Sequence, residues 1–101
     1  MVERVVVYWR DLPSQVILKK GRLKGKALLS EKFQEAIDKA AIRAGKAGTD
    51  DYVAEWHRVT SEIEIGTDLE TAAREEVALL EAQFPDEILN QVIRNGGLVT
   101  A

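Results

Sequence analysis

Cysteine is absent from this chain of 101 residues, and histidine occurs only once, as His57. Without cysteine the chain forms no disulfide bond, has no thiolate nucleophile and binds neither zinc nor an iron–sulfur cluster through sulfur. One histidine is too few to build a zinc site from imidazole ligands. We therefore expect no metal site and no cofactor.

Long hydrophobic runs are also missing, since none approaches the roughly 18–20 residues of a membrane-spanning helix. Residues 1–5 lead directly into a strand-like pattern, without the basic segment and apolar stretch of a signal peptide. Together with the lack of cysteine, this favours a cytoplasmic protein that does not enter a membrane.

The composition is that of a soluble globular domain, with 46% apolar and 31% charged residues. We predict one domain over residues 1–97 and a mobile tail over 98–101. The net charge of −3 is unevenly distributed: residues 1–30 sum to +5, residues 31–60 to −1 and residues 61–101 to −7. The chain therefore has a basic beginning and an acidic end.

Three segments have the composition of strands. Val2–Trp9 is β-branched and aromatic, and Gln15–Lys20 would pair with it across a break at Asp11–Ser14. Val59–Ile65 alternates apolar and polar residues, which predicts a half-buried third strand. Gly21–Lys26 is polar and rich in glycine, so we interpret it as a loop or tight turn, and residues 24–29 could add a short extended piece.

Helical periodicity begins at Ser30, a favourable N-cap, and continues to Gly45. A short helix is predicted from Asp50 to about His57. A capping box formed by Thr67 and Glu70 predicts a third helix, and a fourth is expected over residues 85–94. The predicted fold is α+β: a small antiparallel sheet of about three strands, made of the N-terminal hairpin and one later strand, against three to four helices.

Five cations fall within residues 19–26: Lys19, Lys20, Arg22, Lys24 and Lys26. Their density indicates a surface for an acidic partner or an anionic small molecule. The spacing does not match a phosphate-binding loop, and a solvated basic loop remains the simpler interpretation.

The residues around the first turn form a second candidate site: Trp9, Arg10, Asp11 and Gln15. They could line a polar pocket or serve as protein hot spots. The alternative is a core tryptophan beside a surface ion pair, because alternation places Tyr8 and Trp9 on opposite faces. His57 is expected to end a helix, where a cation favours the helix dipole.

No nucleophile–base–acid set is recognisable, so we assign no catalytic residue. The leading hypothesis is a non-catalytic interaction protein. The alternative is a binder of, or small enzyme acting on, an anionic molecule, with Arg10, Lys20 and Arg22 holding the anion and Asp11 or His57 as acid–base group. Nucleic acid binding is disfavoured, since the whole chain is acidic and no binding motif is present.

Several segments resemble a small bacterial family labelled "virulence factor". They are residues 8–16 (YWRDLPSQV), residues 33–41 (FQEAIDKAA), Ala44-Gly45 and residues 51–56 (DYVAEW). The resemblance implies a short bacterial protein, and a similar domain also occurs attached to longer bacterial proteins. Short members lie beside enzymes of folate- and corrinoid-linked methyl transfer, including methylenetetrahydrofolate reductase. The resemblance thus implies an accessory subunit in one-carbon metabolism, and it supplies no catalytic residues.

Overall fold

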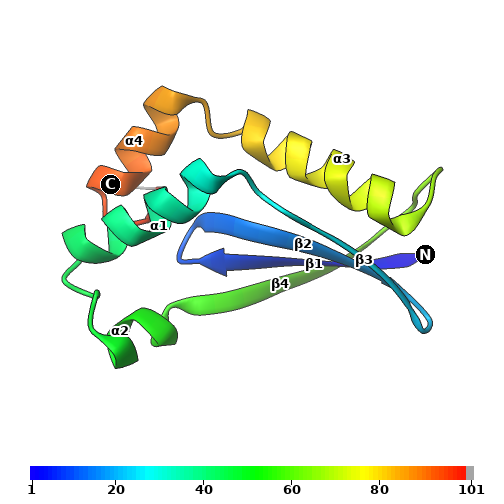
Figure 1. The fold of residues 1–101 in the computed structure, drawn as a ribbon, viewed down its shortest axis with the longest axis horizontal. Helices are drawn as coiled ribbons and strands as arrows, with labels where there is room; N and C mark the ends of the chain where they lie inside the picture. Colours follow the sequence, from blue (N-terminus) through cyan, green and yellow to red (C-terminus); the bar gives the residue numbers. More distant parts are fainter. Residues whose placement is uncertain (100–101) are drawn as a thin grey trace.

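An antiparallel sheet opens the chain and a layer of helices covers one side of it (Figure 1). The computed structural model describes residues 1–99. In chain order its elements are β1 (Val2–Trp9), β2 (Leu12–Lys20), β3 (Leu23–Leu28), α1 (Glu31–Arg43), α2 (Thr49–Ala54), β4 (Trp56–Ile63), α3 (Leu69–Ala82) and α4 (Asp86–Arg94). The predicted α+β class is confirmed. Within the described residues the sheet has four strands rather than about three, and the helices number four.

The strands lie in the order β3-β2-β1-β4, and each neighbouring pair is antiparallel. The additional strand is β3, which replaces most of the expected loop over Gly21–Lys26 and confirms the short extended piece suggested for residues 24–29. Only Gly21 and Arg22 form a turn, and Gly21 has φ +61°. The strand forms because Lys24 and Lys26 alternate with Gly25 and Ala27, so that small residues face the helices.

The first hairpin turn is at Arg10–Asp11, so the prediction of a break over Asp11–Ser14 was wrong. Leu12 and Pro13 already belong to β2 and pair with Trp9 and Tyr8. β3 pairs with β2 only from Gln15 onward, so no strand is paired with Pro13 on that side. Pro13 is tolerated because its missing N–H interrupts no hydrogen-bond ladder with β3. The register also shifts here, between Val7 and Tyr8.

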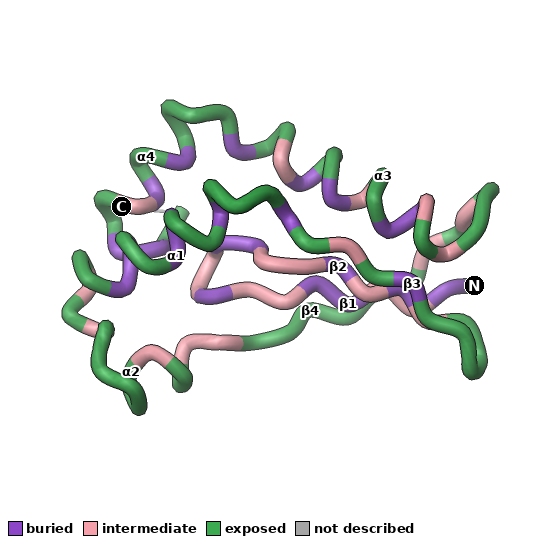
Figure 2. The backbone as a smooth tube through the Cα atoms, in the orientation of Figure 1, coloured by how far each residue is buried: buried purple, intermediate pink, exposed green. Residues whose placement is uncertain are grey.

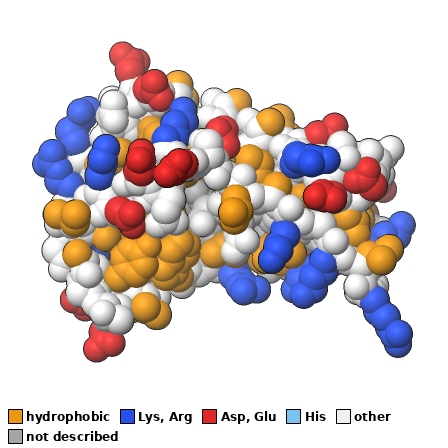
Figure 3. All heavy atoms as spheres, in the orientation of Figure 1, with side chains coloured by type: hydrophobic (Ala, Val, Ile, Leu, Met, Phe, Trp, Pro, Cys, Tyr) orange, Lys and Arg blue, Asp and Glu red, His pale blue; other side chains and the backbone are white. Residues whose placement is uncertain are grey.

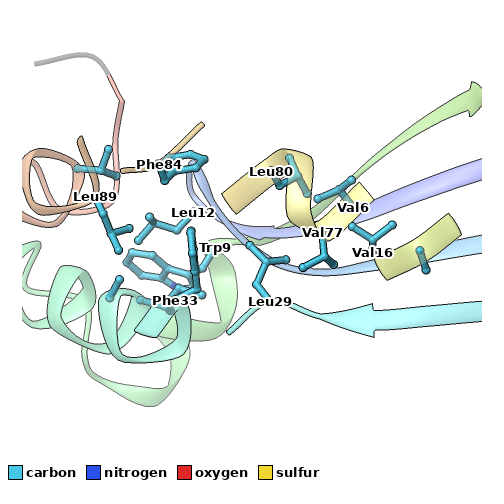
Figure 4. Close-up of a cluster of buried hydrophobic side chains, with 14 of the residues drawn as sticks. Val6, Trp9, Leu12, Val16, Leu29, Phe33, Val77, Leu80, Phe84 and Leu89 are labelled. Carbon is cyan, nitrogen blue, oxygen red and sulfur yellow. The ribbon is translucent and has the colours of Figure 1, made fainter. Parts of the chain in front are cut away.

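Helices α1, α3 and α4 enclose the core against one face of the sheet, and their buried sides turn toward it in Figure 2. The predicted stripe of α1 is confirmed from Phe33 to Ala41. Figure 4 shows Val77 and Leu80 of α3 next to Val6 and Val16 of the sheet. At the other end of the core, Trp9, Leu12 and Phe33 lie near Leu89 of α4.

The helix before β4 is shorter than expected, and His57 is a strand residue. Helix α2 ends at Ala54, and β4 begins at Trp56 opposite Trp9. The cap of α3 is Asp68 rather than Thr67, and its carboxylate accepts the Thr71 N–H at 2.8 Å. Pro85 is the N-cap of α4 and not its first residue.

None of the helices within residues 1–99 is long and apolar enough to cross a membrane. Of the predicted mobile tail, Thr100 and Ala101 lie outside the described residues. The Val99 N–H donates to the Asp11 carboxylate at 2.8 Å, and thereby connects this segment to the first hairpin.

Candidate functional site

The sheet face opposite the helices is bare. We call this uncovered side of the sheet the open face. Strand pairing arranges its side chains in three rows, each of which crosses all four strands. From β3 to β4 the rows are Lys24-Lys19-Glu3-Glu62, Lys26-Ile17-Val5-Thr60 and Leu28-Gln15-Val7-Arg58. Of its four apolar residues, Val5 is buried, with 3% of its surface exposed, whereas Ile17 and Val7 are half-buried and Leu28 is 72% exposed.

The open face has four cations and two carboxylates, a net charge of +2. Because the whole chain has a net charge of −3, the other residues sum to −5. The open face is thus more basic than the rest of the molecule, although acidic residues of α3 pack against the basic strands on the other side of the sheet. In Figure 3 basic side chains lie at the lower right, where Figure 1 places the β2–β3 turn.

The predicted interaction residues divide into three groups. Gln15, Lys19, Lys24 and Lys26 share the open face. Lys20 points to the helix side and Arg22 lies in the turn after β2. The remaining three, Trp9, Arg10 and Asp11, belong to the first hairpin.

Trp9 is fully buried, so its side chain is not available to a partner. Its ring stacks on Tyr52, with centroids 5.8 Å apart, and its Nε1–H donates to the Tyr52 carbonyl at 2.8 Å. Gly97 lies against the same ring, where an added Cβ would approach to 2.9 Å. Trp9 therefore holds α2 and the residues after α4 to the hairpin.

Arg10 is committed to internal bonds. Its φ of 52° lies in the left-handed region, which no other non-glycine residue adopts within residues 1–99. Its Nε–H donates to the Glu55 carboxylate at 3.2 Å, and Nη1 donates to the Gly96 carbonyl at 3.1 Å. Its backbone N–H donates to the Glu55 carbonyl. These bonds stabilise a backbone conformation that arginine disfavours.

A cleft of about 360 Å³ lies beside this turn, lined in part by Tyr8, His57 and Phe84. The His57 ring stacks on Tyr8 at 5.5 Å, and its Nε2 lies 2.6 Å from the Arg10 carbonyl, to which it donates. The Asp11 carboxylate accepts the Val99 N–H. The ionisable groups at this cleft thus support the hairpin, and His57 has no role at a helix end.

A wider hollow of about 820 Å³ lies between the β2–β3 turn and the start of α3. Its lining includes three cations, Lys20, Lys24 and Arg74, and the carboxyl residues Asp68 and Glu70. The Thr71 backbone N–H, followed by its hydroxyl, lowers the pKa of Asp68 below its ordinary value of 3.8. Asp68 is therefore an anion at neutral pH and opposes a second anion there.

The three cations of the anion-binding hypothesis do not converge. Arg10 lies just before β2, whereas Lys20 ends that nine-residue strand and Arg22 follows it. Within residues 1–99, no group of three or more His, Asp or Glu side chains is arranged to hold a metal ion.

Comparison with known families matches residues 7–93 to the family described as "Virulence factor". The chain belongs to the virulence factor family. The match begins near the end of β1 and ends within α4, and it includes both hairpin turns and most of the open face. Comparisons with curated proteins and with solved structures gave no significant match. The family description names neither a reaction nor a ligand.

Sequence reasoning missed the apolar centre of the open face and Arg58. Apolar residues on both faces of 2–9 indicated a central strand that is covered on both sides or meets a partner, and its valines were interpreted as core. Val5 is buried as expected, whereas Val7 is half-buried on the open face. Placing Arg58 required the start of β4, which was set three residues too late. The alternation of lysine and small residues in 24–27 was the available signal for β3.

Proposed function

We propose that this member of the virulence factor family is a non-catalytic accessory protein that binds another protein through its open face. The observation that supports this is a four-stranded sheet with one uncovered side. On that side the half-buried Ile17 and Val7 lie around the buried Val5 and form an apolar centre, with lysines toward β3. Apolar surface bordered by charge is characteristic of protein interfaces.

The charges specify the kind of partner. Lys24 and Lys19 lie next to each other in the first row, and Lys26 begins the second. Like charges side by side disfavour the free surface, and an acidic partner would relieve this repulsion. The helix side, which belongs to the residues that sum to −5, would repel the same partner and orient its approach.

The partner we propose to test first is an enzyme of folate- or corrinoid-linked methyl transfer in the cytoplasm, such as a methylenetetrahydrofolate reductase. This choice rests on the proteins beside which short members of the family occur. The tagged chain is copurified from native cells, and binding to the enzyme recovered is then measured with both proteins purified.

The decisive comparison uses two double variants with the same change in charge. Lys24→Glu/Lys26→Glu changes the open face, whereas Lys39→Glu/Arg43→Glu changes exposed positions on α1. We expect the first to weaken binding at least about tenfold, and the second to leave it within about twofold. Equal effects of both variants, or a purified chain that binds no such enzyme, would reject the proposal.

The alternative, binding of an anionic small molecule through the basic 19–26 segment, is carried by the hollow beside Lys20 and Arg74. Titration of the chain with inorganic phosphate and with di- and tricarboxylates, followed by amide chemical shifts, tests it. Shifts confined to residues 20–24 and 65–74 that saturate and disappear in Lys20→Ala would support it, and unchanged shifts would exclude it.

A further inference from the structure

The outer edge of β4 has no partner strand within residues 1–99, because β4 is the last strand of the sheet and pairs only with β1. It is eight residues long, and its six central residues are exposed. An unpaired edge of this length presents a row of free N–H and C=O groups that can pair with another strand.

The two edges of the sheet differ in how they are protected. β3 has six residues and includes two lysines and a glycine, and the start of α3 packs on its helix-side face at Gly25. Such features discourage pairing between molecules. β4 has no lysine, proline or glycine, and it pairs with β1 without a bulge. The central residue pair Val59-Thr60 is β-branched and favours a strand.

The charges on β4 complement those of a second β4. A two-fold axis normal to the sheet preserves its two faces, so residues of the same face pair across an antiparallel junction. If the axis passes through Thr60, then Arg58 lies opposite Glu62 of the second copy, and Glu62 lies opposite its Arg58. Neither side chain forms an ion pair within residues 1–99.

We propose that the chain forms a two-fold homodimer by antiparallel pairing of β4 with β4 of a second copy, centred on Thr60. The dimer has one continuous eight-stranded sheet, with α1, α3 and α4 of both copies on one side. The two open faces then lie side by side in one surface. This inference does not depend on the accessory function, because the β4 edge and the lysine-rich β3 side are at opposite borders of the sheet.

Cysteine cross-linking tests the register directly, because the chain has no cysteine of its own. At the axis the two residues 60 lie directly opposite, where Cα atoms of paired antiparallel strands are about 4.5–5.5 Å apart, within disulfide range. We expect Thr60→Cys to give a disulfide-linked dimer under mild oxidation. The matched control Lys26→Cys, on the other edge strand of the same face, stays monomeric.

Charge reversal tests the pairing without a covalent bond. Arg58→Glu places a carboxylate opposite Glu62 of the second copy, at both of the symmetry-related positions. We expect this repulsion to raise the dimer dissociation constant at least about tenfold. Arg58→Glu/Glu62→Arg restores opposite charges and should restore dimerisation. Sedimentation equilibrium measures both variants, and circular dichroism confirms that each remains folded.

Three results would overturn the proposal. A wild-type chain that is monomeric at NMR concentrations excludes it. A dimer that Arg58→Glu leaves intact and that Thr60→Cys does not cross-link uses another surface, such as two open faces packed together. A double variant no better than Arg58→Glu shows that residues 58 and 62 are not partners.

Discussion

Arg10 is held in a left-handed backbone conformation by hydrogen bonds from its side chain and from its own main chain. Glycine is the usual residue at such a position, since it has no Cβ to crowd the following carbonyl. The arginine side chain offsets the strain by donating hydrogen bonds to Glu55 on one side and to Gly96 on the other. Its guanidinium also lies 5.6 Å from the centre of the Trp9 ring.

Two substitutions separate the side chain's bonds from the backbone strain. Arg10→Ala keeps the strained φ and loses the bonds, and we expect it to destabilise the fold by about 2–3 kcal/mol. Arg10→Gly loses the same bonds but relieves the strain, so it should cost about 1 kcal/mol less. Urea unfolding measures the difference, and equal stabilities would show that the φ of 52° carries no strain.

Asp68 predicts a pH dependence. Its pKa is lowered in the folded protein by the Thr71 N–H, so the carboxylate's contribution is complete above the ordinary value of 3.8. That contribution is lost as the pH falls through the lowered pKa. We expect Asp68→Ala to reduce the melting temperature at pH 7 by a few degrees, and the gap from wild type to close as the pH falls below 3.8. A gap independent of pH would show that the cap acts through shape and not charge.

At the scale of elements, the close approach of α3 to β3 decides how the helix layer lies on the sheet. Gly25 makes it possible, because a Cβ there would lie 2.4 Å from the Leu69 carbonyl carbon and 2.6 Å from the Glu70 nitrogen. Those atoms are backbone and cannot rotate away. The ion pair of Arg4 with Glu76, at 2.6 Å, then fixes α3 along β1.

Gly25→Ala should therefore separate α3 from β3 and destabilise the fold by about 2–3 kcal/mol. Gly66→Ala is the matched control, since nothing lies within 4 Å of the added Cβ and its backbone is not left-handed. The control should stay within about 0.5 kcal/mol of wild type. Chemical denaturation of both variants measures this, and equal losses would contradict the close contact.

Elements with a strong period were predictable from the sequence, and turns were less so. The valine run gave β1 its correct ends, and the alanine-rich stripe of α1 identified its buried side. Pro13 misplaced the first turn, because a proline in a strand is tolerated only where the neighbouring strand has ended, and that depends on β3. The glycines around Lys24 suggested a loop, whereas Gly25 is a strand residue whose missing side chain lets α3 approach β3 closely.

The candidate site was only half predictable for a related reason. Lysines 19, 24 and 26 were identified by charge density, but their gathering on one face follows from strand register. Arg10 and Trp9 drew attention as an aromatic–cationic pair, and the structure uses both inside the fold. Residue type alone does not distinguish a buried hydrogen-bonded arginine from an exposed one.

At the scale of the whole molecule, the first hairpin is joined to the last described residues. The Asp11 N–H donates to the Gly97 carbonyl at 2.9 Å, and Arg10 and Val99 add the bonds described above. These contacts span 86 to 88 residues of sequence. They place the segment after α4 against the turn between β1 and β2.

Two C-terminal truncations should reduce the stability of the fold by different amounts. A chain that stops after Asn95 loses the Gly96, Gly97 and Val99 contacts, and we expect it to lose about 3 kcal/mol or more of stability. A chain that stops after Gly97 keeps the first two contacts and should lose about 1 kcal/mol. Thermal unfolding compares both with wild type, and equal losses would place the stabilisation beyond Gly97.

The same closure has a consequence for how the protein is made. A ribosome delivers the chain from its N-terminus, so Trp9 emerges long before Gly96 and Gly97. Until those glycines arrive, Arg10 lacks the Gly96 carbonyl as an acceptor and the Trp9 ring lacks its contact with Gly97. The nascent hairpin should therefore remain a substrate for chaperones during most of translation, and mature only when residues 96–99 dock onto it.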